Sequence, residues 1–205
     1  MNSENVPDII VSRLPVYLRA LQRMAENGVM TTSSQELGDN VGISAAQIRK
    51  DLSQFGEFGK QGTGYNIPFL IDHLCKILKV DRSWNVAVVG MGELGRAIAR
   101  YQGFANRGFH VQKCFDSDPG KIGQHVGEVV ISDIKNIVNE VKDAGIKVAM
   151  LCVPAEVAQE VTKQLVEAGV QGILNYAPVS LSVPENVKVQ YIDPAIGLQR
   201  ITYYL

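Results

Sequence analysis

A glycine pattern directly behind an apolar run restricts what the second half of this chain can fold into. Residues 90–95 read Gly-Met-Gly-Glu-Leu-Gly, after a β-prone run at 85–89 and before an expected helix from about Leu94 to Gln102. In a G-x-G-x-x-G turn the first glycine permits the tight bend, the second lets the backbone approach a pyrophosphate, and the third lets helix pack on strand. We therefore expect phosphates at the start of this helix, against Gly90, Met91, Gly92, Glu93, Leu94 and Gly95.

The segments around this pattern predict an α/β fold of the Rossmann type. Strands and helices alternate from Trp84 onward, which favours a parallel sheet. The expected strands are 85–89, 109–115, a short one at 127–131, 148–153, 172–174 and 187–192. Besides the helix behind the glycines, the expected helices begin at Asp133, cover 155–168 and begin again at Pro194.

Two carboxylates indicate which dinucleotide the site prefers. Asp116 lies twenty-one residues after Gly95, at the end of the second strand, where it can accept a hydrogen bond from an adenosine ribose hydroxyl. Asp118 follows closely, and no arginine is near to receive a 2′-phosphate. The sequence therefore predicts NAD(H) rather than NADP(H). The alternative is a glycine turn that only packs tightly and binds nothing.

The first eighty residues predict short helices joined by tight turns. An amphipathic helix includes Leu14 and ends near Gly28. Two later segments begin with the spacing of a capping box, and a turn at 40–43 separates them. The residues of these boxes are Ser33 with Glu36, and Ser44 with Gln47. Two short helices around a glycine turn form a helix-turn-helix.

A hairpin is expected to complete this unit. Residues 56–65 are too rich in glycine for a helix and predict a hairpin, after which a helix is expected over 68–78. The whole is a winged helix-turn-helix. We place the domain boundary in the polar connector 79–83, which gives a DNA-binding domain at 1–81 and a nucleotide-binding domain at 82–205.

Any DNA binding must depend on local geometry, because the formal net charge is −1 and residues 1–80 carry eight basic and eight acidic side chains. Side chains on the second helix of the motif can read the major groove, and those at the tip of the hairpin can enter the minor groove. The expected DNA-binding residues are Ser44, Gln47, Arg49, Lys50, Ser53, Lys60, Gln61 and Gly62. The alternatives are a solvated polar face or a protein-interaction module.

Catalytic and metal-binding patterns are weak. The three cysteines are far apart, and His73, His110 and His125 are scattered. Tyr101 is not followed by a lysine four residues on, so the short-chain dehydrogenase pairing is missing. We expect neither an enzyme nor a metal site. The N-terminus has no secretory pattern and no apolar run is long enough to span a membrane, so we expect a cytoplasmic protein.

Motifs along the whole chain resemble those of the Rex redox-sensing transcriptional repressors. The matching residues are 12–15, 17–19, 47–53, 62–65, 90–95, Tyr101 and 175–178. The resemblance implies a homodimer that binds a palindromic operator, senses the NADH/NAD+ ratio and leaves the DNA when NADH binds. It adds Asn175, Ala177 and Pro178 to the expected cofactor residues. An NAD-dependent oxidoreductase with an interaction module, or a repressor answering to another nucleotide, are the alternatives.

The resemblance also implies an interdomain switch of Arg19, Tyr101 and, from the partner subunit, the residue equivalent to Asp193. The family's wing usually has an arginine where this chain has Gln61, so minor-groove binding is expected to be weaker or partly taken over by Lys60.

Two further hypotheses concern the nicotinamide ring and the C-terminus. An apolar niche of Val153, Pro154, Ala177 and Pro178 would prefer the neutral reduced ring to the oxidised cation. The final apolar helix, about 194–205, is expected to pack against the partner subunit. The alternative is that it covers its own sheet.

Overall fold

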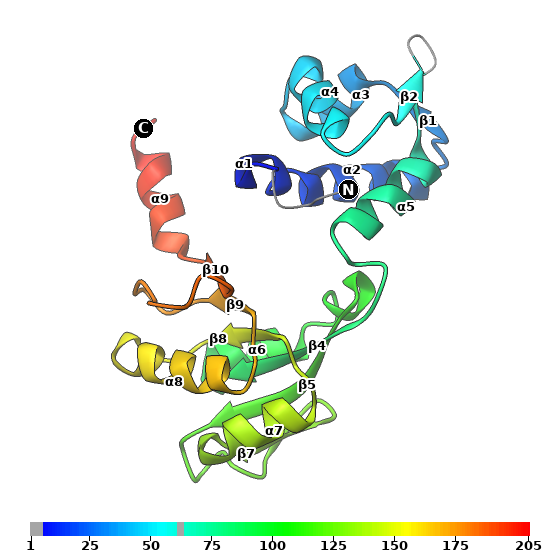
Figure 1. The fold of residues 1–205 in the computed structure, drawn as a ribbon. Coiled ribbons are helices and arrows are strands. Elements are labelled where there is room, and N and C mark those ends of the chain that lie inside the picture. Colours follow the sequence, from blue (N-terminus) through cyan, green and yellow to red (C-terminus); the bar gives the residue numbers. More distant parts are fainter. Residues whose placement is uncertain (1–5, 61–63) are drawn as a thin grey trace. The chain divides into compact units, whose positions relative to one another are not determined.

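The computed structural model describes residues 6–60 and 64–205. The chain divides into two compact units, Met1–Arg82 and Ser83–Leu205, one residue beyond the boundary expected from the sequence. Figure 1 shows both, with the first unit in blue to green and the second in green to red.

The first unit is a helical domain with a small antiparallel sheet in the order β1-β3-β2. Its core is formed by apolar side chains from α2, α3, α4 and α5, of which Leu14, Leu37, Ile48 and Leu70 are fully buried. The elements are α1 (Asp8–Val11), α2 (Leu14–Glu26), β1 (Thr31–Thr32), α3 (Ser34–Val41), α4 (Ala45–Ser53), β2 (Gly59–Lys60), β3 (Gly64–Asn66) and α5 (Ile67–Ile77).

The two predicted capping boxes differ in the structure. At α3 the box is complete, because Ser33 Oγ accepts from the Glu36 amide at 3.1 Å and Glu36 Oε2 accepts from the Ser33 amide at 2.8 Å. At α4 only half of it forms: Ser44 Oγ accepts from the Gln47 amide at 3.3 Å. The prediction of a second complete box was wrong, because the Gln47 side chain bonds to Asp51 instead.

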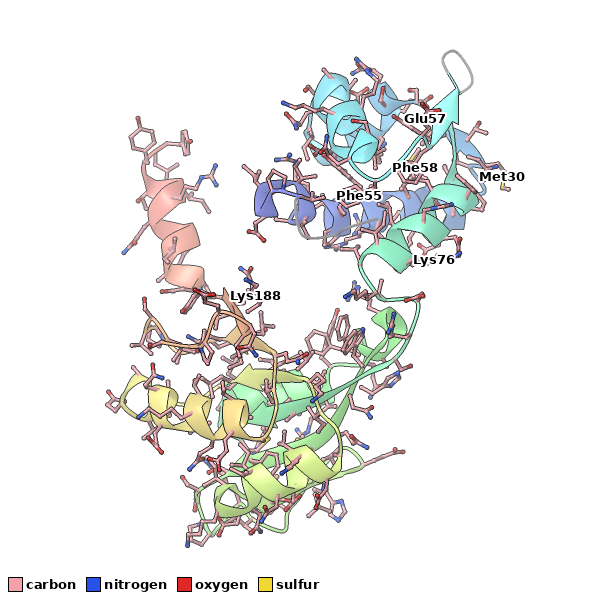
Figure 2. The ribbon with its side chains drawn as sticks, in the orientation of Figure 1. Met30, Phe55, Glu57, Phe58, Lys76 and Lys188 are labelled. Carbon is pink, nitrogen blue, oxygen red and sulfur yellow. The ribbon has the colours of Figure 1, made fainter. Side chains whose placement is uncertain are left out.

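The hairpin is attached to the core by aromatic side chains. Phe58 is buried in the core of the first unit and Phe55 is partly buried against it, so both secure the segment that leads from α4 to β2 (Figure 2). Gly64 has a φ of +71° and packs closely on the Thr32 backbone, a position that favours glycine.

The second unit is a seven-stranded sheet in the order β10-β9-β8-β4-β5-β7-β6, parallel except for the edge strand β6. The strands are β4 (Trp84–Val89), β5 (Phe109–Asp116), β6 (His125–Val126), β7 (Val129–Asp133), β8 (Val148–Leu151), β9 (Gly172–Asn175) and β10 (Lys188–Tyr191). The helices are α6 (Glu93–Arg100), α7 (Ile137–Asp143), α8 (Ala155–Glu167) and α9 (Pro194–Thr202), with short 3₁₀ turns at Ala105–Arg107 and Ile134–Asn136.

Helices cover both faces of this sheet, as the α/β prediction requires. Ile137 and Val141 of α7 and Leu165 of α8 pack on one face in a single cluster, and Figure 1 shows these two helices on the same side. Ile98 of α6 packs on the other face with Val86 and others. The short strand expected at 127–131 corresponds to β7, which begins two residues later, at Val129, because Gly127, with a φ of +62°, turns the chain between β6 and β7.

The last helix lies apart from the core. No residue of α9 is buried, and Ile196, Leu198 and Ile201 expose 63%, 64% and 57% of their surface. Figure 1 shows α9 leading away from the sheet beyond β10. Among the helices of the described ranges, none is both long and apolar enough to cross a membrane.

Candidate functional site

The glycine turn after β4 has two glycines that the fold itself requires. Gly90 has a φ of +92°, and a Cβ on it would collide with the Cys152 backbone. A Cβ on Gly95 would collide with the Gly90 carbonyl, where α6 crosses the turn. These two positions are therefore explained by packing of the helix on the strand.

Gly92 is different, because nothing in the protein requires a glycine there. Its φ is −72°, and a Cβ built on it would meet nothing within 4 Å. It lines an open cavity together with Gly90 and Leu94. A missing side chain at this position keeps space free in front of the first turn of α6, as a bound pyrophosphate would need.

The start of α6 offers unpaired donors to the same space. Its N-cap is Gly92, and no side chain caps the helix. The first amides of a helix have no partner within the helix and carry partial positive charge. An uncapped N-terminus beside an open cavity is therefore suited to an anion, and the residues fit a dinucleotide pyrophosphate.

Asp116 occupies the predicted ribose position and is held there by three hydrogen bonds. Its carboxylate is buried and accepts from the Met91 amide at 2.7 Å, the Asp118 amide at 2.9 Å and Lys121 Nζ at 3.1 Å. Burial alone would raise the pKa of Asp116, but these bonds outweigh it and lower the pKa. An ionised carboxylate with an acceptor position left can bind a ribose hydroxyl.

The cavity between these groups has a volume of about 720 Å³. Seven of the thirteen predicted cofactor residues line it: Gly90, Gly92, Leu94, Asp116, Asp118, Val153 and Pro154. The other six are not among the lining residues: Met91, Glu93, Gly95, Asn175, Ala177 and Pro178. Of these, Met91 still contributes its backbone amide to Asp116, while its side chain is buried in the core.

The segment after β9 reaches the cavity through a neighbouring residue. Asn175 is buried and organises the following turn, since its Oδ1 accepts from the Ala177 amide at 2.9 Å and its Nδ2 donates to the Val179 carbonyl at 3.0 Å. Tyr176, between them, lines the cavity. Asn175 thus supports the cavity wall rather than forming it.

Sequence reasoning missed several residues of the cavity wall. Lys121 lies 3.1 Å from Asp116 and 3.8 Å from Asp118, so the two carboxylates do not stand alone. One face of α8 also lines the cavity, and its i, i+3, i+4, i+7 spacing could have been noticed in the sequence. The lining residues outside the predicted set are Ser117, Lys121, Ile134, Cys152, Val157, Glu160, Val161, Gln164 and Tyr176.

The Cys152 thiol remains neutral in this setting. Burial raises its pKa to about 12, so it lines the cavity as an apolar group rather than as a thiolate.

The predicted recognition helix α4 presents some of the expected residues to solvent. Ile48 and Leu52 are buried, whereas Arg49 and Lys50 are exposed. Arg49 Nη1 donates to Ser34 Oγ on α3 at 2.8 Å. Ser44 and Ser53 are also exposed, and both form local hydrogen bonds. Ser44 Oγ accepts from the Gln47 amide, and the Ser53 hydroxyl donates to the Lys50 carbonyl.

Gln47 is engaged by a buried carboxylate that the sequence reasoning overlooked. Asp51 is fully buried and accepts from Gln47 Nε2 at 2.6 Å, from Tyr17 Oη at 2.7 Å, and from Arg13 Nε at 2.6 Å and Nη2 at 2.7 Å. Burial would raise the pKa of Asp51, but its bonds with Arg13, Tyr17 and Gln47 lower it overall. The Asp51 cluster, formed by these four residues, therefore joins α2 to α4.

The wing and the expected switch are only partly described. Lys60 ends β2, and Gln61 and Gly62 lie outside the described residues. Arg19 is exposed on α2. Tyr101 follows α6 and is 54% exposed, with its ring edge-on to Phe104 at 5.1 Å. Asp193 caps α9 by accepting from the Ala195 amide at 2.9 Å. Their joint role stays a prediction.

A winged helix-turn-helix joined to a Rossmann-type unit with an open dinucleotide cavity defines a class of transcription regulators that carry a nucleotide-binding domain. Two family models match the corresponding parts: "Putative DNA-binding protein N-terminus" at residues 5–53 and "CoA binding domain" at residues 81–179. The chain is 52% identical over 203 residues to the redox-sensing transcriptional repressor Rex of Chloroflexus aggregans, covering 99% of this chain and 96% of that protein. It is 42% identical to the Rex of Carboxydothermus hydrogenoformans, covering 99% and 98%. The chain belongs to the Rex family of redox-sensing transcriptional repressors.

Solved structures agree with this assignment. A repressor called RSP in complex with β-NAD+ and operator DNA has a TM-score of 0.93 and 36% identity, over 97% of this chain and 92% of that one. The same repressor in complex with β-NADH has a TM-score of 0.90 and 33% identity, over 98% and 95%. The predicted fold class and the predicted family are confirmed.

Proposed function

We propose that this chain represses transcription as a homodimer on a palindromic operator and that NADH, bound in the cavity of the second unit, releases it from DNA. The observation that carries the proposal is the cavity at the start of α6, where an uncapped helix, a side-chain-free Gly92 and the ionised Asp116 converge. Relatives solved with NAD+ and operator DNA, and with NADH, support it.

Each part of the dinucleotide has a proposed position. The pyrophosphate lies against Gly92 and the first amides of α6, and the adenosine ribose donates to Asp116. Asp118 adds a second carboxylate that disfavours a 2′-phosphate, although Lys121 offsets part of this charge. The preference for NAD(H) over NADP(H) is therefore expected to be moderate.

The opposite end of the cavity is proposed to distinguish the redox states. When bound, the cofactor supplies a nicotinamide ring that is cationic when oxidised and neutral when reduced. This ring would have apolar surroundings, formed by Val153, Pro154 and the neutral Cys152 thiol. Ala177 and Pro178, which follow Tyr176 in the chain, are proposed to complete the apolar surroundings. Burying a cation there costs more free energy than burying a neutral ring, so NADH binds more tightly.

The coupling to DNA follows from linkage. If NADH binds a closed dimer more tightly than the DNA-competent dimer, it must weaken operator binding by the same factor. We propose that α9 packs against the partner subunit, and that Arg19, Tyr101 and Asp193 change partners between the two states. We assign the main operator contacts to Arg49 and Lys50. Further contacts, to the phosphates and in the minor groove, are assigned to Ser44, Ser53 and the wing residues Lys60, Gln61 and Gly62.

The chain is proposed to act as a cytoplasmic regulator and not as an enzyme, since the cavity is assigned to sensing. Incubation with NADH and candidate hydroxy acids or ketones should therefore leave the dihydronicotinamide absorbance unchanged. Steady, substrate-dependent consumption of NADH would instead identify an oxidoreductase.

The release of DNA is tested by fluorescence anisotropy with a labelled operator from the gene region that the protein controls. NADH should release the protein at concentrations at least about tenfold below those of NAD+ that have the same effect, and coenzyme A should have no effect. The double variant Arg49→Ala/Lys50→Ala should lose operator binding while its NADH titration stays unchanged. Equal effects of NADH and NAD+ would refute the sensor proposal.

A further inference from the structure

One polar atom in the cavity wall has no partner within the protein. Gln164 Oε1 is buried and accepts no hydrogen bond from any residue of the described ranges. Gln164 also lines the cavity. Buried acceptors are nearly always paired, so an unpaired one that borders a binding cavity points to a donor on the ligand.

The surroundings of Gln164 suit a flat aromatic base. Val157, Val161 and Gln164 are spaced i, i+4, i+7, so they share one face of α8, and all three line the cavity. Ile134, directly after β7, lines it as well. Apolar side chains with a single carboxamide offer a base hydrophobic contact together with one directional hydrogen bond.

The order of the strands places Ile134, which packs against the apolar cluster that contains Val161 of α8, at the adenine end of the dinucleotide. The glycine turn follows β4, Asp116 ends β5, and β7 with Ile134 comes next in the sheet. A ligand with its pyrophosphate at the glycine turn and its ribose at Asp116 therefore continues toward Ile134. Val153 and Tyr176, which follow β8 and β9, lie on the other side of β4 and are left for the second base.

We propose that Gln164 is a specificity-determining residue that recognises the 6-amino group of adenine through Oε1. This inference rests on the proposed function, because it concerns the base at the far end of the same dinucleotide. A carboxamide matches the donor and acceptor pattern of adenine. A 6-oxopurine would bring an acceptor against the Gln164 acceptor, and a site that hydrogen-bonds one substituent rejects the analogue that lacks it.

Glu160 provides a matched comparison on the same helix. It lines the same cavity one turn before Gln164, but its carboxylate is 67% exposed and lies 3.5 Å from Lys163 Nζ. An exposed acceptor that already has a cationic partner gives little selectivity. The discrimination is therefore assigned to Gln164 alone.

The experiment compares NADH with reduced nicotinamide hypoxanthine dinucleotide, which differs only by a 6-oxo group in place of the 6-amino group. Both are titrated into the full-length protein and followed by dihydronicotinamide fluorescence. The natural protein should bind NADH about tenfold more tightly or better. The variant Gln164→Met keeps the length of the side chain and removes the hydrogen bond. Its affinity for NADH should fall, and its affinities for NADH and the hypoxanthine analogue should agree within about twofold. Glu167→Gln, at an exposed position of α8 that does not line the cavity, should keep the original ratio.

Each result has a definite meaning. Equal affinity of the natural protein for the two dinucleotides, or an unchanged preference in Gln164→Met, overturns the role of Gln164 and leaves the NADH sensor proposal standing. Binding of neither dinucleotide by the natural protein overturns both. Gln164→Leu serves as a second variant, and thermal unfolding measured by circular dichroism confirms that each variant is folded.

Discussion

At the scale of single residues, the three glycines of the turn have separable physical roles. Gly90 and Gly95 are fixed by the backbone that surrounds them, whereas Gly92 faces open space. The sequence predicted the turn and the helix that follows it, because the motif implies its own backbone geometry. Lys121 could not be assigned in the same way, since its contact with Asp116 depends on how a surface turn folds back.

Gly92→Ala is expected to separate binding from folding. The added methyl group meets no protein atom, so the free energy of unfolding should change by less than about 1 kcal/mol. The same methyl group occupies the proposed position of the pyrophosphate, so NADH affinity should fall at least about tenfold. Urea unfolding and fluorescence titration measure the two effects.

Gly95→Ala is the control for this pair. Its methyl group would press on the Gly90 carbonyl, so the protein should lose about 1–3 kcal/mol of stability. If Gly92→Ala bound NADH as tightly as the natural protein, the phosphate position assigned to this turn would be wrong.

At the scale of elements, the sequence predicted where the helices lie better than how they are fastened together. Capping signals and glycines are local, so α3 and α4 could be located from them. The Asp51 cluster is not local, because it joins Asp51 of α4 to Tyr17 of α2 and to Arg13 at the N-cap of α2, which are 34 and 38 positions away. The sequence did not reveal this contact, so Gln47 was predicted as a residue that faces DNA. Within the protein, its side chain bonds to Asp51.

Asp51→Asn should loosen the attachment of α4 to α2. An amide in place of the buried carboxylate has no charge and forms weaker hydrogen bonds with the same donors. The unfolding free energy of the first unit should therefore fall by about 2 kcal/mol. Asp72→Asn, which removes the exposed partner of Lys76 (labelled in Figure 2), should change stability by less than about 0.5 kcal/mol. Urea unfolding followed by circular dichroism compares the two.

The effect of Asp51→Asn should also depend on pH. The pKa of Asp51 is lowered below its ordinary value of 3.8 by its hydrogen bonds, which outweigh burial. The natural protein therefore has the full stabilisation above that value and loses it as the pH falls through the lowered pKa. The difference in unfolding free energy between the natural protein and the variant should be largest at neutral pH and shrink below about pH 3.8. A difference that does not change with pH would show that the charge of Asp51 is not responsible.

At the scale of the whole molecule, the order of motifs was enough to predict the architecture and the family. The glycine turn, the alternating strands and the winged helix follow one another along the chain, so no long-range pairing had to be guessed. The spacing of the α8 residues indicates a helix face, but its place in the cavity wall could not be predicted, because it depends on how the crossover from β8 brings that face to the same cavity as Asp116 and Ile134. Net charge gave no help, since −1 over 205 residues favours no partner.

The exposed apolar side chains of α9 lead to the prediction about assembly. Ile196 and Leu198 are 63% and 64% exposed in the single chain. Replacing them with aspartate costs little free energy if α9 remains in solvent, but much if α9 packs on a partner, because the charges would then be buried. The double variant Ile196→Asp/Leu198→Asp should therefore run as a monomer in light scattering at concentrations where the natural protein is a dimer. Because both operator half-sites must be bound together, operator affinity should fall more than tenfold, while the cavity residues themselves are untouched. A variant that kept the dimer mass but unfolded more easily would instead place α9 on its own sheet.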